Sequence, residues 1–147
     1  NKGATVLGVT EKTLRDHYQI RAVLEGYACV LCVETGADLS ALQNCLKVSE
    51  EMLASGDSSR YSDMNQSFHY EIWNASGNEK LVTMLSELWN GLSMGVQTTE
   101  MEYAKKSFVE HKKIYEAIAA KDAETARAQM EKHIRRSLED MLTRYRE

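Results

Sequence analysis

The chain has 147 residues, with 18 Lys and Arg against 22 Asp and Glu, which gives a formal net charge of −4. This length corresponds to one domain, and the negative charge argues against a binder of the nucleic-acid backbone, which usually carries a basic excess. No apolar run approaches the roughly 18 residues that cross a bilayer, and the first residues are not typical of a secretory signal. Three cysteines do not make a disulfide framework, so we expect a reducing, cytoplasmic location.

The absence of proline favours an all-α fold. Residues 1–9 are small and apolar and are typical of a strand remnant or a linker. A long helix is then predicted over Glu11–Glu34, with Thr10 as its N-cap and Gly36 as its C-cap. Its apolar residues follow the helical period rather than the strand period.

Three more helices are predicted in the middle of the chain. The first begins at Asp38, which we expect to cap it, and ends near Gly56. The next runs over Arg60–Ala75 and is ended by Gly77. The third begins after its N-cap Asn78.

The end of that third helix is harder to place. We expect a break either near 97–100 or between Ala104 and Ser107, followed by a helix that contains His111. Asp122 is predicted to be the N-cap of the last helix. The short turns between these long helices predict antiparallel neighbours in a bundle.

Three of the four histidines, His69, His111 and His133, lie on the inward stripes of three different helices, and Asn65 lies one turn before His69. Buried imidazoles need partners for both ring nitrogens, and a divalent ion would supply one to all three. Three imidazoles and one oxygen, with coordination positions left open, are typical of a reactive or ligand-binding metal site. Periodicity alone leaves open the alternative of hydrogen-bonded core histidines.

Two pairs of charged residues bear on the chemistry. Arg21 and Glu25 lie one turn apart among apolar residues, and they either form a surface ion pair or place an arginine fork for a carboxylate ligand. A metal enzyme would need a general acid or base beside the metal. Glu110 and Glu131 lie off the inward stripes of their helices, which disfavours that reading.

Several stretches resemble one known family. Residues 21–28 resemble the first long helix of the FCD effector-binding domain, found in the FadR-like subfamily of GntR bacterial transcription regulators. Residues 65–69 and then 75–78 resemble its D/N-x-x-F-H…A-x-G-N signature. Residues 110–118 and 126–133 resemble its E-H…A-I and M-x-x-H-I signatures.

The resemblance extends from Leu14 to Leu142 and implies an antiparallel bundle of six or seven helices around a central ligand and metal cavity. It implies a divalent metal ion, with zinc favoured over nickel or manganese, and a small carboxylate effector on its open side. The implied ligands are Asn65, His69, His111 and His133. Many members have Asp as the first ligand, so the neutral Asn65 is a departure that weakens the expected metal site.

Regulators of this family also carry an N-terminal winged helix that binds DNA, and residues 1–6 resemble the last strand of its wing. We therefore expect a wing or linker remnant over 1–9 and an FCD-like effector-binding and dimerisation domain over 10–147. The expected function is effector sensing in a homodimeric transcription regulator, not catalysis. Arg21 is the expected effector-binding residue, DNA is contacted only through the N-terminal domain, and no membrane is contacted.

Two alternatives remain at this stage. One is a metal-dependent enzyme of helical-bundle fold that acts on a small organic acid, which turnover of a bound acid would reveal. The other is a metal-free helical interaction module, which metal analysis of protein made without a histidine tag would reveal.

Overall fold

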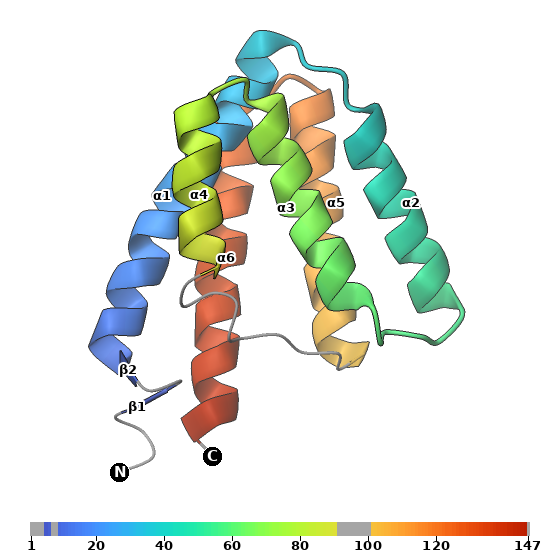
Figure 1. Ribbon diagram of the computed structural model, residues 1–147. Helices are drawn as coiled ribbons and strands as arrows, with labels where there is room; N and C mark the ends of the chain where they lie inside the picture. Colours follow the sequence, from blue (N-terminus) through green and yellow to red (C-terminus); the bar gives the residue numbers. More distant parts are fainter. Residues whose placement is uncertain (1–4, 7–8, 91–100, 147) are drawn as a thin grey trace.

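The computed structural model describes residues 5–6, 9–90 and 101–146, and within these ranges the chain is a bundle of six α-helices (Figure 1). A two-residue ladder precedes the bundle, in which β1 (Thr5–Val6) pairs antiparallel with β2 (Val9–Thr10). The helices are α1 (Glu11–Thr35), α2 (Ser40–Ala54), α3 (Tyr61–Ala75), α4 (Glu79–Asn90), α5 (Met101–Ala119) and α6 (Ala123–Arg146). The prediction of an all-α bundle is confirmed.

Capping explains where α1 and α2 begin and end. The Thr10 hydroxyl accepts the amide proton of Thr13 at 3.1 Å, and Gly36 ends α1 in the left-handed conformation with φ of 64°. The Asp38 carboxylate accepts the amide proton of Ser40 at 2.9 Å, but the residue at the N-cap position of α2 is Leu39. Asp38 therefore stabilises the start of α2 from the position before the N-cap, and not from the N-cap itself as predicted.

The structure tests one of the two predicted positions of the break between α4 and α5. α5 is continuous through Ala104 and Ser107, so the alternative of a break at those residues is wrong. The other alternative, near 97–100, lies outside the described residues.

α1 is the central element, because it packs against α3, α4, α5 and α6. Its contact with α6 is the most extensive in the bundle, and Gly26 permits it. A Cβ at Gly26 would lie 3.1 Å from the Cγ atoms of both Arg127 and Glu131. Glycine therefore allows the two helix backbones to approach closely.

All three cysteines are buried as free thiols: Cys29, Cys32 and Cys45.

Among the described residues, no helix combines the length and the apolar character that crossing a bilayer requires. The central cavity expected from the resemblance stays a prediction.

The cap of α4 gives a test of the fold. The Asn78 side-chain oxygen accepts the amide proton of Leu81 at 3.0 Å. Asn78→Ala should therefore lower the free energy of unfolding by about 1 kcal/mol in urea titration. Asn74→Ala, at an exposed position near the end of α3, is the control and should change it by less than about 0.5 kcal/mol. An equal effect of the two substitutions would contradict the assignment of the cap.

Candidate metal centre

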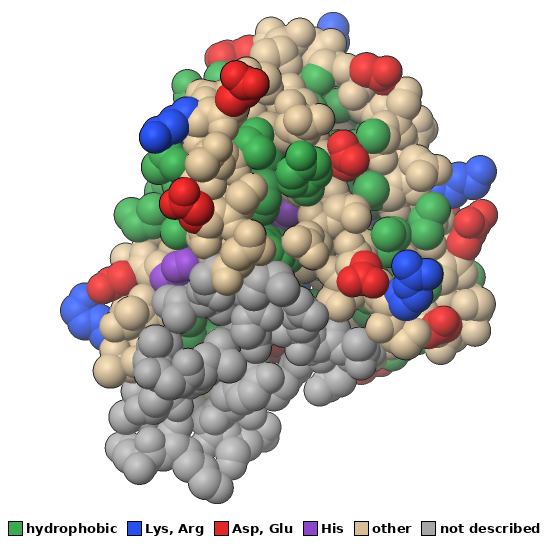
Figure 2. Space-filling model, viewed as in Figure 1, with side chains coloured by type: hydrophobic (Ala, Val, Ile, Leu, Met, Phe, Trp, Pro, Cys, Tyr) green, Lys and Arg blue, Asp and Glu red, His purple; other side chains and the backbone are tan. Residues whose placement is uncertain are grey.

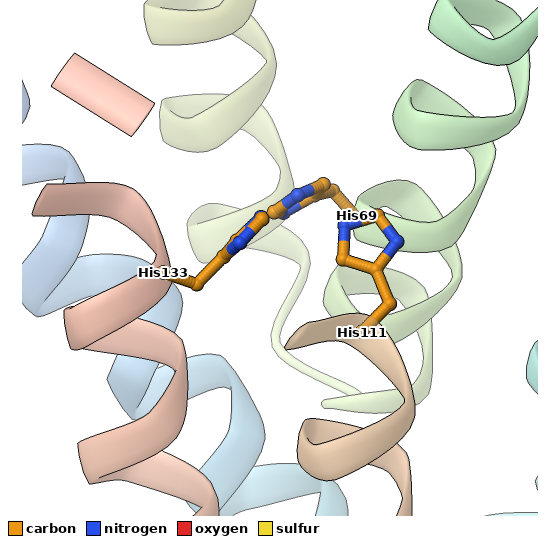
Figure 3. Close-up of side chains that lie close together, drawn as sticks. All are labelled: His69, His111 and His133. Carbon is orange, nitrogen blue, oxygen red and sulfur yellow. The ribbon is translucent and has the colours of Figure 1, made fainter. Parts of the chain in front are cut away.

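Three imidazoles from three helices meet in the interior of the bundle (Figure 3). His69 comes from α3, His111 from α5 and His133 from α6, and all three are buried. Each offers a ring nitrogen, and the three nitrogens lie within 4.8 Å of one another. The prediction that these residues face inward together is thus correct in its geometry.

His69 is oriented by Glu25 of α1. Its Nδ1 lies 2.6 Å from Glu25 Oε1, which also accepts a hydrogen bond from Trp73 Nε1 at 2.9 Å. The other carboxylate oxygen, Oε2, accepts a hydrogen bond from Arg21 Nε at 2.7 Å. Since an ionised carboxylate can only accept, Nδ1 of His69 carries a proton, and in the neutral imidazole Nε2 is then the nitrogen with the lone pair. A carboxylate behind a ligand histidine is the usual way in which proteins fix its tautomer and orientation.

His133 has the same arrangement with a different carboxylate. Its Nδ1 lies 2.5 Å from Glu110 Oε1, so Nε2 is again the nitrogen with a lone pair. Arg136 holds Glu110 from the other side, with Nε and Nη2 each 2.7 Å from a carboxylate oxygen. Two of the three histidines are therefore positioned by glutamates, and each glutamate is paired with an arginine.

His111 has weaker polar contacts. Its ring stacks on Phe68 with centroids 4.0 Å apart and an interplanar angle of 9°. Its two nitrogens lie 3.4 Å from the hydroxyls of Tyr61 and Ser107, which are themselves joined by a hydrogen bond of 2.9 Å. Stacking thus orients this ring more than hydrogen bonding does.

Two buried side-chain atoms of α3 have no hydrogen-bond partner: His69 Nε2 and Asn65 Oδ1. Orphaned buried polar atoms are uncommon and costly. They belong to residues one turn apart on α3, whose side chains lie on the same face. A lone pair on an imidazole nitrogen and an amide oxygen are both metal ligands, so the donor set fits a divalent ion.

The protonation states agree with this fit. Burial and the neighbouring imidazoles lower the pKa of His111 well below its usual range, and burial lowers the pKa of His133 to about 4 despite its bond to Glu110. Burial alone would raise the pKa of the Glu110 carboxyl, but hydrogen bonds from His133 and Arg136 bring it to about 2. Near neutral pH, His111 and His133 are therefore neutral, as metal ligation requires.

Glu25 stays ionised although it is fully buried. Burial raises the pKa of its carboxyl, but the adjacent His69 and Arg21 and the hydrogen bonds that it accepts outweigh burial and hold the pKa well below its usual range. Arg21 is itself buried, and its guanidinium carbon lies 4.6 Å from the centre of the Trp89 ring. The alternative of a surface ion pair between Arg21 and Glu25 is therefore wrong.

Arg21 lies near His69 on the side of its carboxylate partner. Trp89, which it covers, has its ring centre 5.4 Å from that of His69, and Glu25 bridges Arg21 and His69 directly. Its predicted role toward an effector stays a prediction. The fourth histidine, His17, belongs to a different place, where it hydrogen-bonds the backbone of Leu88.

The glutamate partners are what the sequence reasoning missed. Glu25 had a signal, because a carboxylate within the buried stripe of a helix must have a partner in the interior. No sequence signal identified Glu110, because it lies off the inward stripe of α5 and contacts His133 on the neighbouring helix.

Comparisons with known proteins agree on one family. A family model described as FCD domain matches residues 16–136. The HTH-type transcriptional regulator LutR of Bacillus subtilis (strain 168) is 30% identical over 155 residues, which span 97% of this chain and 68% of that protein.

Two solved structures share the fold. The metal-free FCD domain of TM0439 matches with a TM-score of 0.76 and 20% identity, over 90% of this chain and 94% of that one. McbR/YncC of E. coli matches with a TM-score of 0.80 and 24% identity, over 96% of this chain and 69% of that one.

Proposed function

Because this chain belongs to the FCD-domain family of GntR-type transcription regulators, we propose that it is the effector-sensing and dimerisation part of such a regulator. In this proposal the FCD-like domain covers 10–147, and residues 1–9 belong to a wing or a linker. DNA is contacted by a winged-helix domain rather than by this chain, whose net charge is −4. We place the protein in the cytoplasm and assign it no catalytic activity.

A divalent metal ion is the first ligand of the proposed site. Four donor atoms would hold it: Asn65 Oδ1, Nε2 of His69, Nε2 of His133 and one nitrogen of His111. The observation that carries this proposal is the pair of buried, unpartnered donors, His69 Nε2 and Asn65 Oδ1. Zinc suits the imidazole-rich donor set best, with nickel and manganese as alternatives. When bound, the ion supplies a positive charge and open positions for a ligand.

The second ligand is a small carboxylate, which follows from charge. The four donors are neutral, and the two glutamates behind them are each paired with an arginine, Glu25 with Arg21 and Glu110 with Arg136. The charge of the ion is thus left largely uncompensated in the interior, where isolated charge is costly. An anionic effector that also approaches the Arg21 guanidinium offsets this cost.

Binding would regulate through a shift between two arrangements of the bundle. An effector that prefers one arrangement moves the equilibrium toward it by its difference in affinity. About 1.4 kcal/mol of such coupling is enough for a tenfold change in DNA affinity. Native mass spectrometry of untagged protein would report the metal, any retained acid and the oligomeric state together.

The role of Arg21 gives a direct test of the effector proposal. Arg21→Lys retains the positive charge but removes the planar fork. It should weaken carboxylate binding by about 1.5–3 kcal/mol, the scale of a charged hydrogen bond, in calorimetry of the zinc-loaded chain. Arg135→Lys, at a solvent-exposed position of α6, is the matched control and should have no effect.

The ligand panel should pair each acid with its neutral amide. The proposal expects the acid to bind and the amide to bind far more weakly. Equal affinity for an acid and its amide would contradict an anionic effector, and conversion of a bound acid by the metal-loaded chain would contradict the assignment as a sensor.

A further inference from the structure

The three imidazoles are enclosed by the bundle, and each is at most 2% exposed. An ion or an acid can reach them only through a passage in the wall of the bundle. A cleft of about 320 Å³, here called the α3–α4 cleft, is lined by residues of these two helices, among them Gln66, Tyr70, Trp73, Ser86 and Trp89. Figure 2 looks onto this side of the molecule, and imidazole atoms are visible at the bottom of a hollow where α3 and α4 run in Figure 1.

Two indoles separate the α3–α4 cleft from the imidazoles. The ring centre of Trp89 lies 5.4 Å from that of His69, and Trp73 hydrogen-bonds Glu25, the carboxylate that orients His69. The two indoles contact each other edge to face, with ring centres 5.9 Å apart. Trp73 is 2% exposed and Trp89 is 7% exposed, so together they form the wall between the cleft and the interior.

The two indoles differ in how they are held. Trp73 Nε1 donates a hydrogen bond of 2.9 Å to Glu25 Oε1, whereas Trp89 Nε1 is buried without a hydrogen-bond partner. A buried donor that makes no hydrogen bond costs about 1–3 kcal/mol. Rotation of the Trp89 ring into the cleft removes this cost, because the exposed Gln66 and Asn90 show that the cleft is open to water. Trp73 is therefore fixed, and Trp89 is held by ring contacts alone.

Arg21 lies directly behind Trp89. Its guanidinium carbon is 4.6 Å from the centre of the Trp89 ring, and the residue is 5% exposed. Rotation of Trp89 would uncover this guanidinium, so an acid that passes the indole meets a positive charge first. The lining of the cleft has one charged side chain, Glu71, which favours the approach of a cation. The passage thus offers a suitable charge to both proposed ligands.

We propose that the α3–α4 cleft is the entrance to the three imidazoles and that the Trp89 side chain is its gate, with Trp73 as a fixed part of the wall. The position of the Trp89 ring sets how fast ions and small acids reach the interior and excludes bulkier molecules. This inference rests on the proposed metal centre and specifies how it is reached.

The rates of zinc exchange test the gate. In stopped-flow mixing of the metal-free chain with zinc and a chromogenic zinc indicator, Trp89→Phe should raise the association and dissociation rate constants together, by about tenfold. The dissociation constant should stay unchanged, because entry and exit use one passage. The substitution removes no hydrogen bond, since Trp89 Nε1 has no partner. A merely structural role of Trp89 would change the dissociation constant instead.

A removable plug tests the route. Ser86 lines the cleft from α4, and Ser86→Cys labelled with a bulky methanethiosulfonate reagent should slow zinc uptake by about tenfold or more. Reduction of the mixed disulfide with a phosphine should restore the rate. Val109→Cys is the control, because Val109 is 50% exposed on α5, and its label should leave the rate unchanged. Treated wild type, whose three cysteines are buried, accounts for the native thiols.

The accessibility of His69 gives a measurement that needs no metal. Diethyl pyrocarbonate modifies accessible imidazoles, and mass spectrometry reports the rate at each histidine. In the metal-free chain, His69 should react faster in Trp89→Phe and more slowly in labelled Ser86→Cys than in the wild type. Circular dichroism should show that both variants are folded.

The outcomes separate the entrance from the metal centre. Equal reactivity of His69 in both variants and the wild type would overturn the inference, and so would zinc binding whose rates neither variant changes. Absence of zinc binding, with the reactivity of His69 changed as expected, would contradict the proposed metal centre and support the entrance.

Discussion

His111→Ala should leave the chain largely without metal, whereas His17→Ala should retain it. His111 is buried with a ring nitrogen within 4.8 Å of those of His69 and His133, while His17 lies apart from them on α1. Loss of a group that only orients a ligand typically costs 10–100-fold in metal affinity. Loss of the ligand itself should cost more than this. Elemental analysis of untagged protein, followed by zinc titration, measures the difference.

The stability of the fold must be separated from metal binding in this experiment. His111→Ala also removes the ring that stacks on Phe68, so the variant should be less stable even without metal. The informative quantity is the rise in melting temperature when zinc is added, since a ligand that binds only the folded state stabilises it. The wild type and His17→Ala should show this rise and His111→Ala should not. An equal rise in both variants would eliminate the proposed ligand set.

Glu25→Ala should lower the free energy of unfolding of the metal-free chain by about 3–5 kcal/mol. Glu25 is fully buried, and its removal leaves the buried guanidinium of Arg21 without the carboxylate that accepts from its Nε. It also removes the acceptor for His69 Nδ1 and Trp73 Nε1. The loss of a buried ion pair and of two further hydrogen bonds is the reason for the large effect. Urea unfolding measures it.

Glu110→Ala is the comparison for this prediction. Glu110 makes equivalent hydrogen bonds to His133 and Arg136, but its side chain is 24% exposed. Arg136 also lies 3.6 Å from Asp140, so it keeps a carboxylate after the substitution. The loss of stability should therefore be clearly smaller than for Glu25→Ala. Losses of equal size would mean that burial of the Arg21–Glu25 pair does not determine the energy.

Local signals in the sequence were sufficient to place most helices. Thr10, Gly36 and Asn78 cap their helices because capping depends on residues three or four positions away in the chain. The helical period of the apolar residues also places His69, His111 and His133 on inward faces. A helical period identifies which residues face the core, and this information is local.

The contacts that build the site are not local. His69 and Glu25 are far apart in the sequence, and their hydrogen bond exists because α1 and α3 pack at one particular height and rotation. Periodicity specifies neither quantity, so the interior location of the Arg21–Glu25 pair could not be separated from a surface one. The role of Glu110 could not be predicted from its position on α5, because its side chain extends from the flank of α5 to His133 on α6.

The junction between the β1–β2 ladder and α1 has a mechanical consequence. Thr10 is both the last residue of β2 and the N-cap of α1, so strand and helix are joined without an intervening loop. Glu25 lies fifteen residues further along, about 22 Å at 1.5 Å per residue. If α1 pivots at Glu25, this length is a lever arm, and a tilt of about 10° carries the β1–β2 ladder through about 4 Å. Under such a tilt the paired strands β1 and β2 would move with α1, because no loop separates them from it.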